Sequence, residues 1–349
     1  MAASDVPASE VPAPGVPSEF RAFRVEVDGD HVHRTVTSLP VGALPDNDVT
    51  VRVAYSSLNY KDALSASGNR GVTRHYPHTP GIDAAGTVLA SRDARFAAGD
   101  RVLCTGFDLG MDVPGGFGEL VRVPGDWLVP LPEGLSEREA MVLGTAGLTA
   151  AIGLELLQTV GVVPGGRPVV VTGASGGVGS LAVALLARAG YEVIASTGTT
   201  AAHPLLKRLG ASGFLEREAL GNPTSRPLLE GLYAGGIDTV GGDTLAGLLK
   251  HTAVGGAVAA CGMVGGAELQ VSVFPFILRG VALLGIDSQH YPMASRRAMW
   301  RTLAGAWRVP DLADVPGLVE EIGLDGLETA IEDILVGATV GRVLVRPAP

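Results

Sequence analysis

The chain has 349 residues, and 46% of them are hydrophobic, which is enough for two buried cores. Its 26 Lys and Arg residues against 36 Asp and Glu residues give a formal net charge of −10. No basic stripe that could neutralise a phosphate backbone is present, so we expect no nucleic-acid partner.

The N-terminal 140 residues predict a β-rich domain preceded by a disordered tail. Residues 1–19 hold four prolines, acidic residues and no basic residue, which is typical of disorder and unlike a signal peptide. Short alternating segments such as FRAFRVEV, DVTVRVAY and DRVLCTG then follow, separated by Pro, Gly and Asp. They predict an antiparallel barrel or sandwich. The same pattern returns in GRVLVRP at residues 341–347, so both ends of the chain are expected to build this domain.

The middle of the chain carries a glycine-rich turn, VVVTGASGGVGS, at residues 169–180. A buried strand runs into this turn and a helix should leave it, an arrangement that can bind phosphate at the helix N-terminus. The spacing is G-x-x-G-x-x-G, and a tight structural connection is the alternative interpretation. Five further strand-like segments follow at intervals up to VALLGID (281–287). This alternation favours a doubly wound parallel sheet of six strands, with a dinucleotide at the carboxyl ends of the strands.

Cysteine usage and hydropathy predict a soluble, cytoplasmic protein without a membrane partner. Cys104 and Cys261 both lie in apolar, strand-like runs, so we expect buried thiols rather than a disulfide or metal ligands. The longest uncharged stretch, residues 252–267, is too short to span a bilayer.

The ordered motifs together resemble the acryloyl-CoA reductase family, which is grouped with quinone oxidoreductases in the medium-chain dehydrogenase/reductase superfamily. They are SSLNYKDAL (56–64), PGIDAAGTV (80–88), GGFGELVRV (115–123), GDWLVPLP (125–132), GTAGLTA (144–150), VTGASGGVGS (171–180), IDTVGG (237–242), AACG (259–262) and PFILRG (275–280). The resemblance implies an α/β protein with a GroES-like β-rich catalytic domain (20–143 and 288–349) around an inserted Rossmann domain (144–287). It also implies a homodimer, which could form through the edge strand VALLGID.

The resemblance also implies chemistry without a metal. Zinc alcohol dehydrogenases carry a His-Glu pair in the segment that here reads PGIDAAGTV, and Ile82 and Asp83 occupy those positions. Two cysteines cannot form a four-cysteine structural site. His75 and His78 have no cluster of ligands beside them and are interpreted as loop histidines.

Metal-free members of the superfamily add hydride to activated C=C bonds or to quinones. Reduction of an α,β-unsaturated thioester creates an enolate, which needs hydrogen-bond donors, and then a proton at the α-carbon. Asn59 and Tyr60 in SLNYKDA are the candidate catalytic residues. Asn59 can equally be a helix N-cap with Asp62 as its capping-box partner, and Tyr60 can be a packing residue.

The segment after the second strand, ASTGTTAAH (195–203), holds no acidic residue for the ribose hydroxyls, so a 2′-phosphate is permitted there, and the resemblance implies NADPH as the cofactor. The chain departs from the family at Thr199, where an arginine is common, and Arg217 is a candidate source of the missing charge. The predicted cofactor-binding residues are Thr145, Ser175, Gly176, Gly177, Val178, Gly179, Ser180, Thr197, Thr199, His203, Arg217, Met263, Ser288 and Arg342. Thr145 could instead be only a helix cap, and Arg342 only a surface strand residue.

The resemblance therefore implies NADPH-dependent reduction of acryloyl-CoA to propanoyl-CoA. Reduction of quinones or other enones is the alternative, and a non-catalytic NADPH-binding sensor is a remoter one. Arg70, Arg74, Arg296 and Arg297 could attract the phosphates of coenzyme A, although each could be a solvated surface residue.

Overall fold

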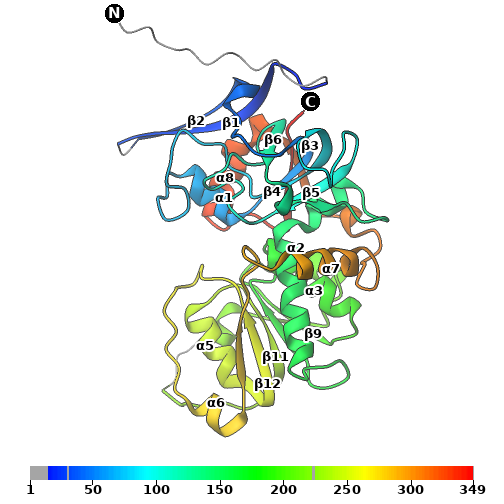
Figure 1. The fold of residues 1–349 in the computed structure, drawn as a ribbon. Helices are drawn as coiled ribbons and strands as arrows, with labels where there is room; N and C mark the ends of the chain where they lie inside the picture. The colour runs from blue at the N-terminus through cyan, green and yellow to red at the C-terminus, as the bar shows by residue number, and fades with distance from the viewer. Residues whose placement is uncertain (1–14, 30, 222–224, 349) are drawn as a thin grey trace, which may run out of the picture. The chain divides into compact units, whose positions relative to one another are not determined.

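The computed structural model describes residues 15–29, 31–221 and 225–348, which form two compact units. Unit 1 comprises Met1–Leu131, Glu321–Val336 and Leu344–Pro349, and unit 2 comprises Pro132–Glu320 and Gly337–Val343. Figure 1 shows the chain path through both. Most of the predicted tail, residues 1–14, lies outside the described residues, and Glu19 already belongs to the first strand.

The alternating segments of unit 1 form a two-stranded hairpin and a larger sheet. A hairpin pairs β1 (Glu19–Asp28) with β2 (His31–Pro40). A seven-stranded sheet has the order β14-β15-β3-β4-β5-β7, with β6 beside β3. Its strands are β3 (Val49–Leu58), β4 (Asp83–Ser91), β5 (Arg101–Thr105), β6 (Leu120–Val123), β7 (Val129–Pro130), β14 (Val319–Gly323) and β15 (Arg342–Arg346). The β-rich domain built from both ends of the chain is thereby confirmed.

Unit 1 is filled by the inward residues of these strands. Val51, Val53, Val102 and Val121 form its core, as alternation along half-buried strands requires. Two helices, α1 (Tyr60–Ala66) and α8 (Leu327–Leu335), pack against each other.

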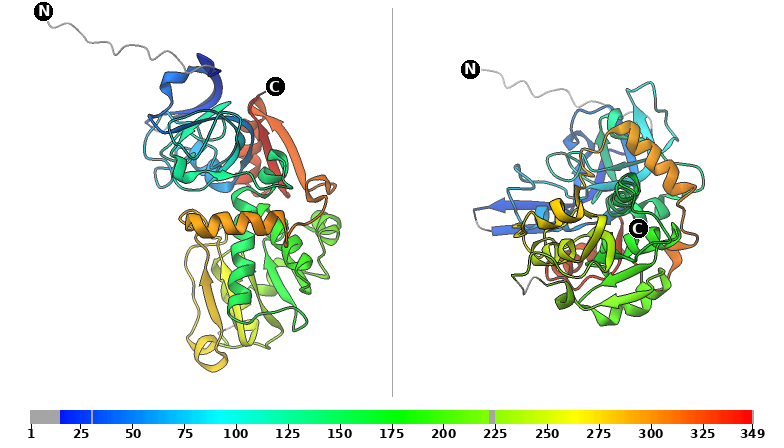
Figure 2. Two further views of the ribbon diagram at one scale, coloured as in Figure 1. Left: turned by 45° about the vertical axis from the view of Figure 1, so that its right-hand side comes forward. Right: turned by 90° about the horizontal axis from the view of Figure 1, so that it is seen from below.

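Unit 2 contains the predicted six-stranded parallel sheet, in the order β10-β9-β8-β11-β12-β13. Its strands are β8 (Val169–Thr172), β9 (Val193–Ser196), β10 (Gly213–Leu215), β11 (Tyr233–Asp238), β12 (Thr252–Ala260) and β13 (Ala282–Gly285). Helices α2 (Glu137–Thr159) and α3 (Gly177–Arg188) cover one face, and α5 (Gly242–His251) covers the other (Figures 1 and 2). The remaining helices are α4 (His203–Arg208), α6 (Phe274–Arg279) and α7 (Met293–Ala304).

The division between the units differs from the predicted boundaries at 143/144 and 287/288. Helix α2 begins at Glu137, where Ser136 and Glu139 form a capping box, and it runs through position 144 without leaving unit 2. Helix α7 packs against α2, which keeps the residues after β13 in unit 2 as well. A motif marks where a strand or turn lies, but packing between helices decides where a compact unit ends.

Helix α2 is the one helix of the described residues that is long and apolar enough to cross a membrane. In its most apolar window 83% of the residues are buried, which is typical of the core helix of a folded domain. Cys104 and Cys261 do not form a disulfide. Cys104 is buried as expected, whereas Cys261 is only half-buried and its Sγ lies 3.5 Å from the carbonyl oxygen of Asp238.

Candidate functional site

The glycine-rich turn follows β8 and opens helix α3. Gly173 has φ +58°, and a Cβ on it would collide with the hydroxyl of Thr239. A Cβ on Gly179 would collide with the carbonyl oxygen of Gly173, so the helix packs directly on the turn. Gly176 is the N-cap of α3, and the first helical turn presents its backbone N–H groups there. The predicted residues Ser175–Gly179 therefore form one contiguous turn that suits an anion such as a pyrophosphate.

The buried carboxylate of Asp238 binds the end of β8, where this turn begins, and sequence reasoning did not find it. Thr172 donates to Oδ1 of Asp238 (2.7 Å), and the backbone N–H of Gly241 donates to Oδ2 (2.7 Å). Thr239 adds a further hydrogen bond to the same strand end, because its hydroxyl donates to the carbonyl oxygen of Thr172 (2.8 Å). Burial raises the pKa of Asp238 despite these donors. The available signal was an acidic residue at the end of the buried strand in IDTVGG.

Several predicted cofactor residues meet at the carboxyl end of β9. The hydroxyls of Ser175 and Thr197 lie 2.9 Å apart, and the backbone N–H of Thr199 donates to Thr197 Oγ1 (3.0 Å). The guanidinium group of Arg217 lies against Gly198, where its Nε and Nη2 are 3.3 Å from the position of an added Cβ. A positively charged group thus lies beside Gly198, one residue before Thr199.

His203 lies next to this cluster and begins helix α4. Its ring stacks on Phe214, with ring centroids 4.0 Å apart and an interplanar angle of 11°. The stack fixes the imidazole beside the end of β9.

A second group of predicted cofactor residues lies around a break in α2. Gly144 interrupts the helix with φ 51° and ψ −153°, and Thr145 begins the second half. The hydroxyl of Thr149 donates to the carbonyl oxygen of Thr145 (2.7 Å) and lies 2.9 Å from the hydroxyl of Ser288. The structure thus brings Thr145 and Ser288 together although 143 positions separate them.

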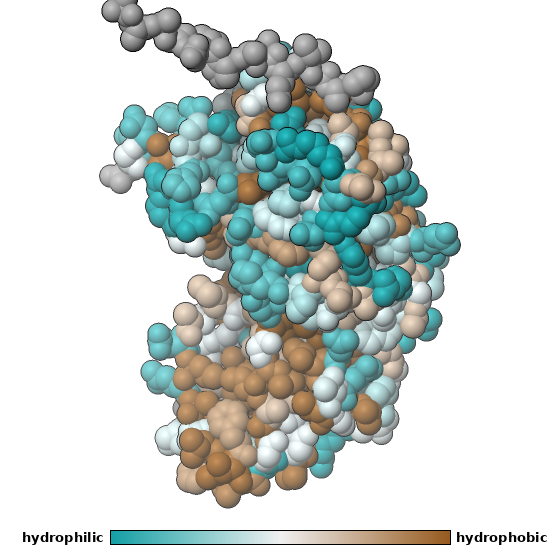
Figure 3. Space-filling model, in the orientation of Figure 1, coloured by the Kyte–Doolittle hydropathy of each residue, from teal (hydrophilic) through white to brown (hydrophobic). Residues whose placement is uncertain are grey.

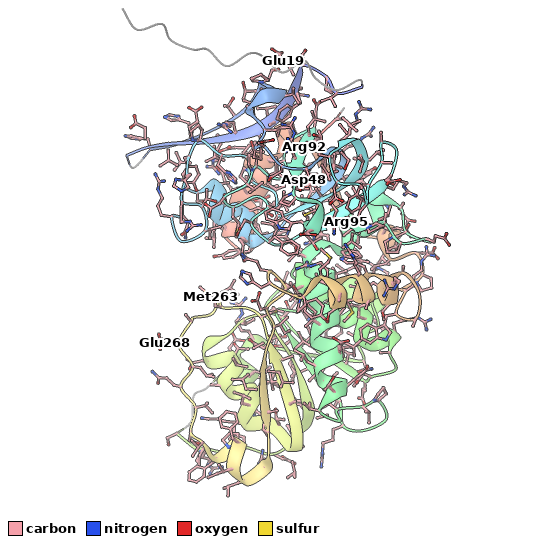
Figure 4. All side chains as sticks on the ribbon, in the orientation of Figure 1. Glu19, Asp48, Arg92, Arg95, Met263 and Glu268 are labelled. Carbon is pink, nitrogen blue, oxygen red and sulfur yellow. The ribbon has the colours of Figure 1, made fainter. Side chains whose placement is uncertain are left out.

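The remaining predicted cofactor residues differ in exposure. Arg342 is 2% exposed, and its Nε donates to the carbonyl oxygen of Val142 (2.9 Å), so it is not the surface strand residue considered as an alternative. Ser180 is buried within α3. Met263 is 67% exposed in the loop after β12, where Figure 4 labels it.

In unit 1, the candidate catalytic segment starts helix α1 and is bound to two carboxylates. Asn59 is the N-cap of α1 and forms the expected capping box with Asp62. Its Nδ2 also donates to Asp83 Oδ2 (2.8 Å), so the amide nitrogen faces the carboxylates. Ser57 donates to the same oxygen of Asp83 (2.6 Å). Tyr60, the first residue of α1, is 41% exposed.

Asp62 does more than cap a helix. Its Oδ1 accepts hydrogen bonds from the backbone N–H groups of Gly81 (3.1 Å) and Ile82 (2.8 Å), which fasten the PGIDAAG segment to α1. Burial and the neighbouring Asp83 carboxylate raise the pKa of Asp62 to about 7, while the N–H donors oppose this shift. Sequence reasoning found only the local capping role, because the other partners lie about 20 positions away.

Not all of the arginines considered for coenzyme A are available to a ligand. Arg296 is fully buried and donates to the carbonyl oxygens of Ser288 (2.9 Å) and Gln289 (3.0 Å), so it supports the chain after β13 instead. Arg74 is exposed and paired with Asp112. Arg70 lies over the ring of Tyr76, 5.0 Å from its centroid.

The described residues contain no group of three or more His, Cys, Asp or Glu side chains that could hold a metal ion. Ile82 is buried, and the Asp83 carboxylate beside it is bound to Ser57 and Asn59. His75 is exposed, whereas His78 is buried.

Comparisons with known proteins extend these observations. Residues 45–133 match the alcohol dehydrogenase GroES-like domain, and residues 177–305 match the family described as zinc-binding dehydrogenase. The chain is 45% identical to a putative quinone oxidoreductase, YhfP, of Bacillus subtilis, over 94% of this chain and 98% of that protein. It is 46% identical to a probable acrylyl-CoA reductase, AcuI, of Escherichia coli, over 94% of this chain and 99% of that protein.

Solved structures of such proteins agree closely with the fold. The YhdH oxidoreductase of Salmonella enterica, crystallised with NADP, matches with a TM-score of 0.90 at 46% identity, covering 94% of this chain and all of that one. Bacillus subtilis YhfP, crystallised with NAD, matches with a TM-score of 0.91 at 45% identity, covering 95% of this chain and all of that one.

Proposed function

Since the chain belongs to the acryloyl-CoA reductase family of zinc-free medium-chain dehydrogenases/reductases and is an oxidoreductase, we propose that it reduces the C=C bond of acryloyl-CoA with NADPH. The products are propanoyl-CoA and NADP⁺. The names of the relatives leave reduction of quinones as the second candidate, because YhfP is described as a putative quinone oxidoreductase.

The observation that carries the cofactor assignment is the cluster at the end of β9. A dinucleotide whose pyrophosphate binds at the N-terminus of α3 places its adenosine ribose near the end of the next strand. There the chain presents Thr197, Thr199 and the guanidinium group of Arg217, and residues 195–203 include no acidic residue. A 2′-phosphate matches this set, whereas the ribose hydroxyls of NADH would lack their usual acidic partner.

The bound cofactor supplies a hydride for the β-carbon of the thioester, and negative charge then develops on the carbonyl oxygen. We assign the donor to this enolate to the phenol of Tyr60, which is partly exposed at the start of α1. Asn59 orients this segment, because its amide nitrogen is directed at the Asp83 carboxylate. The α-carbon takes its proton from Tyr60 or from water.

Steady-state kinetics of the purified protein test the substrate. We expect kcat/KM for acryloyl-CoA with NADPH to exceed that for a simple quinone such as 1,4-benzoquinone. An equal or higher kcat/KM for the quinone would refute the acyl-CoA assignment and favour the second candidate.

A direct assay tests whether the protein is an enzyme at all. Loss of the nicotinamide absorbance on adding an enoyl thioester is the expected result. NADPH binding without turnover of any enone or quinone would instead support a non-catalytic sensor.

The role of Tyr60 is tested by Tyr60→Phe, which removes only the hydroxyl. We expect kcat to fall by roughly 10² to 10³, the usual loss for one oxyanion donor, with little change in the Kd of NADPH. Tyr55→Phe is a matched control, since Tyr55 lies within β3 and pairs with Ala85 in the sheet. Unchanged turnover in Tyr60→Phe would assign the donor elsewhere.

We also propose a cytoplasmic homodimer that forms through the edge of the parallel sheet. Strand β13 is an edge strand, and large hydrophobic side chains on it and on α6 are exposed, a liability that pairing with a second copy removes. These side chains are Phe274, Ile277 and Leu278 of α6, Val273 at its N-cap, and Leu283 of β13. Figure 3 shows hydrophobic residues gathered over the α6 end of unit 2.

Sedimentation analysis should give a dimer for the wild type and for the control Val336→Lys, and a monomer for Leu283→Lys. A wild-type monomer would refute this assembly.

A further inference from the structure

Helix α2 contains a backbone break that a distant arginine binds. At Gly144 the helix adopts φ 51° and ψ −153°, and residues on both sides are helical. Such a break separates the carbonyl groups of the preceding turn from their usual donors one turn later. The carbonyl oxygen of Val142, two residues before the break, accepts a hydrogen bond from Arg342 Nε (2.9 Å).

The same arginine lies against the glycine-rich turn. A Cβ on Gly177, the first residue of α3, would be 2.9 Å from Arg342 Nη1. The backbone beside it is also fixed, because the N–H of Gly341 donates to the carbonyl oxygen of Ser175 (2.8 Å). At 2% exposure, the guanidinium group forms a buried connection between the break and the turn.

Both connected features lie at the edge of the sheet where doubly wound proteins bind ligands. Ser175 follows the carboxyl end of β8, and Thr149, one turn after the break, contacts Ser288 beyond the carboxyl end of β13. In the strand order, β9 and β10 lie on one side of β8, and β11, β12 and β13 lie on the other. A dinucleotide with its adenosine half at β9 therefore extends its nicotinamide half toward the side of Thr145 and Ser288.

We propose that Arg342 is a positioning residue that locks the break in α2 to the glycine-rich turn and thereby fixes the nicotinamide half relative to the pyrophosphate. This inference rests on the proposed use of NADPH and goes beyond it. In this inference Arg342 affects hydride transfer indirectly, because it holds Thr145 and the glycine-rich turn in place. Because a displacement of 1 Å in a reacting group costs roughly 10²-fold in rate, the connection affects catalysis more than affinity.

Arg342→Lys separates this function from simple attraction of phosphate, because lysine keeps the charge and loses the planar group that reaches Val142. We expect the Kd of NADPH, measured by fluorescence without any acyl-CoA, to change by less than about threefold. We expect kcat to fall on the order of 10- to 100-fold, with a larger primary isotope effect from 4-deuterated NADPH as hydride transfer becomes limiting. Arg346→Lys, on an exposed residue of the same strand, is the matched control and should behave as wild type.

Two further variants test the connection itself. Guanidinium ion added to Arg342→Ala should restore part of the lost kcat, and ethylammonium should not. Gly144→Ala changes the break from the other side, because its φ of 51° disfavours a side chain. Its effect on kcat should not add to that of Arg342→Lys, since both act on one element.

The opposing results are distinct. Wild-type kcat in Arg342→Lys, or a loss of NADPH affinity that accounts for the whole loss of kcat/KM, would overturn the inference. If Arg342→Lys does not fold, full additivity of Gly144→Ala with Arg342→Ala, or no rescue of Arg342→Ala by guanidinium, would overturn it. Failure of the wild type to bind NADPH would refute the proposed function instead.

Discussion

Gly198 lets a side chain from another part of the chain approach the end of β9. The side chain of Arg217, in the short helix Arg217–Leu220, packs against Gly198. A Cβ added to residue 198 would lie 3.3 Å from its guanidinium nitrogens, which is a tight contact. Thr199 directs its N–H to Thr197 and brings no charge of its own. The preference for a 2′-phosphate should therefore depend on Arg217 more than on any residue of the loop itself.

Arg217→Gln should weaken NADPH binding and leave NADH binding nearly unchanged. A hydrogen bond to a charged group contributes about 1.5 to 3 kcal/mol, which corresponds to roughly one to two decades in Kd. Fluorescence titration with both cofactors measures the effect, and Lys207→Gln on the exposed side of α4 controls for the loss of a nearby charge. Equal weakening of both cofactors would show that Arg217 does not contact the 2′-phosphate.

Thr199→Arg should have the opposite effect on NADPH. The substitution adds a charged donor beside Arg217, so NADPH should bind more tightly while the Kd of NADH stays nearly constant. The wild type should prefer NADPH by a smaller margin than relatives that carry the arginine. A wild type that prefers NADH, or a variant that binds both cofactors more tightly, would contradict the placement of residue 199.

His78 should make folding stability depend on pH. Burial, together with the positive charge of Arg24, lowers its pKa to about 4, although a hydrogen bond with the backbone of Gly110 and the Asp112 carboxylate oppose this shift. The unfolded chain takes up the proton near pH 6.5 and the folded chain only near pH 4, so stability falls as the pH drops through this window. The contribution should reach about 2 to 3 kcal/mol between pH 7 and pH 4.5.

Urea unfolding of wild type and His78→Met at these two pH values isolates the contribution of His78. Asp62 acts with the opposite sign, because its pKa is raised to about 7 and its contribution to stability is lost as the pH rises from about 4 to 7. Asp62 is present in both proteins, so the difference between them belongs to His78. The exposed His75, replaced in His75→Gln, is the matched control. Parallel pH curves for wild type and His78→Met would contradict the buried, neutral state of the ring.

The glycines of the turn after β8 differ in whether they leave room for a side chain. Gly179 packs directly against the carbonyl oxygen of Gly173. A Cβ on Gly179 would lie 2.2 Å from that oxygen, so there is no room for a methyl group. Gly176 has φ −79°, and a Cβ on it would make only an ordinary contact of 3.5 Å with the same carbonyl oxygen. The contact of helix α3 with the turn therefore depends on Gly179 and not on Gly176.

Gly179→Ala should lower the melting temperature of the protein without cofactor and abolish NADPH binding, because α3 must move away from the turn. Overpacking of this kind costs about 1 to 3 kcal/mol. Gly176→Ala is the matched control and should leave the melting temperature nearly unchanged. Scanning calorimetry measures the melting temperature of each variant. Equal melting temperatures for the two variants would show that the turn can shift to accommodate a methyl group at residue 179.

The elements that sequence predicted well are those whose signals are local. The strands of the parallel sheet and the turn at 173–179 follow from hydrophobic runs and adjacent glycines, and all six strands were predicted. The capping box of Asn59 is local too. The hydrogen bonds that Arg342 donates to Val142 and that the N–H of Gly81 donates to Asp62 join positions far apart in the chain, so the spacing of the residues does not predict them. The buried state of Arg296 was missed for a different reason. Its partners Ser288 and Gln289 are close in the chain, but they accept through backbone carbonyls, which leave no mark in the residue types.

The two units differ in the chemical groups that they offer to ligands. The described residues of unit 1 offer hydroxyl, amide and carboxylate groups around the start of α1, and unit 2 offers backbone N–H groups and arginines at the carboxyl edge of its sheet. Both fit a reaction in which the cofactor carries the hydride and the protein supplies orientation and proton donors. The boundaries between the units could not be read from motifs, because helix α2, which packs against β11 and β12, begins before residue 144, and helix α7 packs against α2.

The absence of a zinc ligand at Ile82 predicts that the whole enzyme works without metal. At this position the chain differs from zinc alcohol dehydrogenases. An isoleucine side chain has no atom that can coordinate zinc, and Ile82 is buried. Exhaustive chelation should leave kcat and the melting temperature unchanged, since a lost structural metal would also lower stability. Elemental analysis should find no stoichiometric zinc, and a zinc alcohol dehydrogenase treated in parallel should lose its activity. One zinc per chain, with activity lost on its removal and restored on its return, would overturn both the prediction and the assignment of Tyr60 as the group that stabilises the enolate.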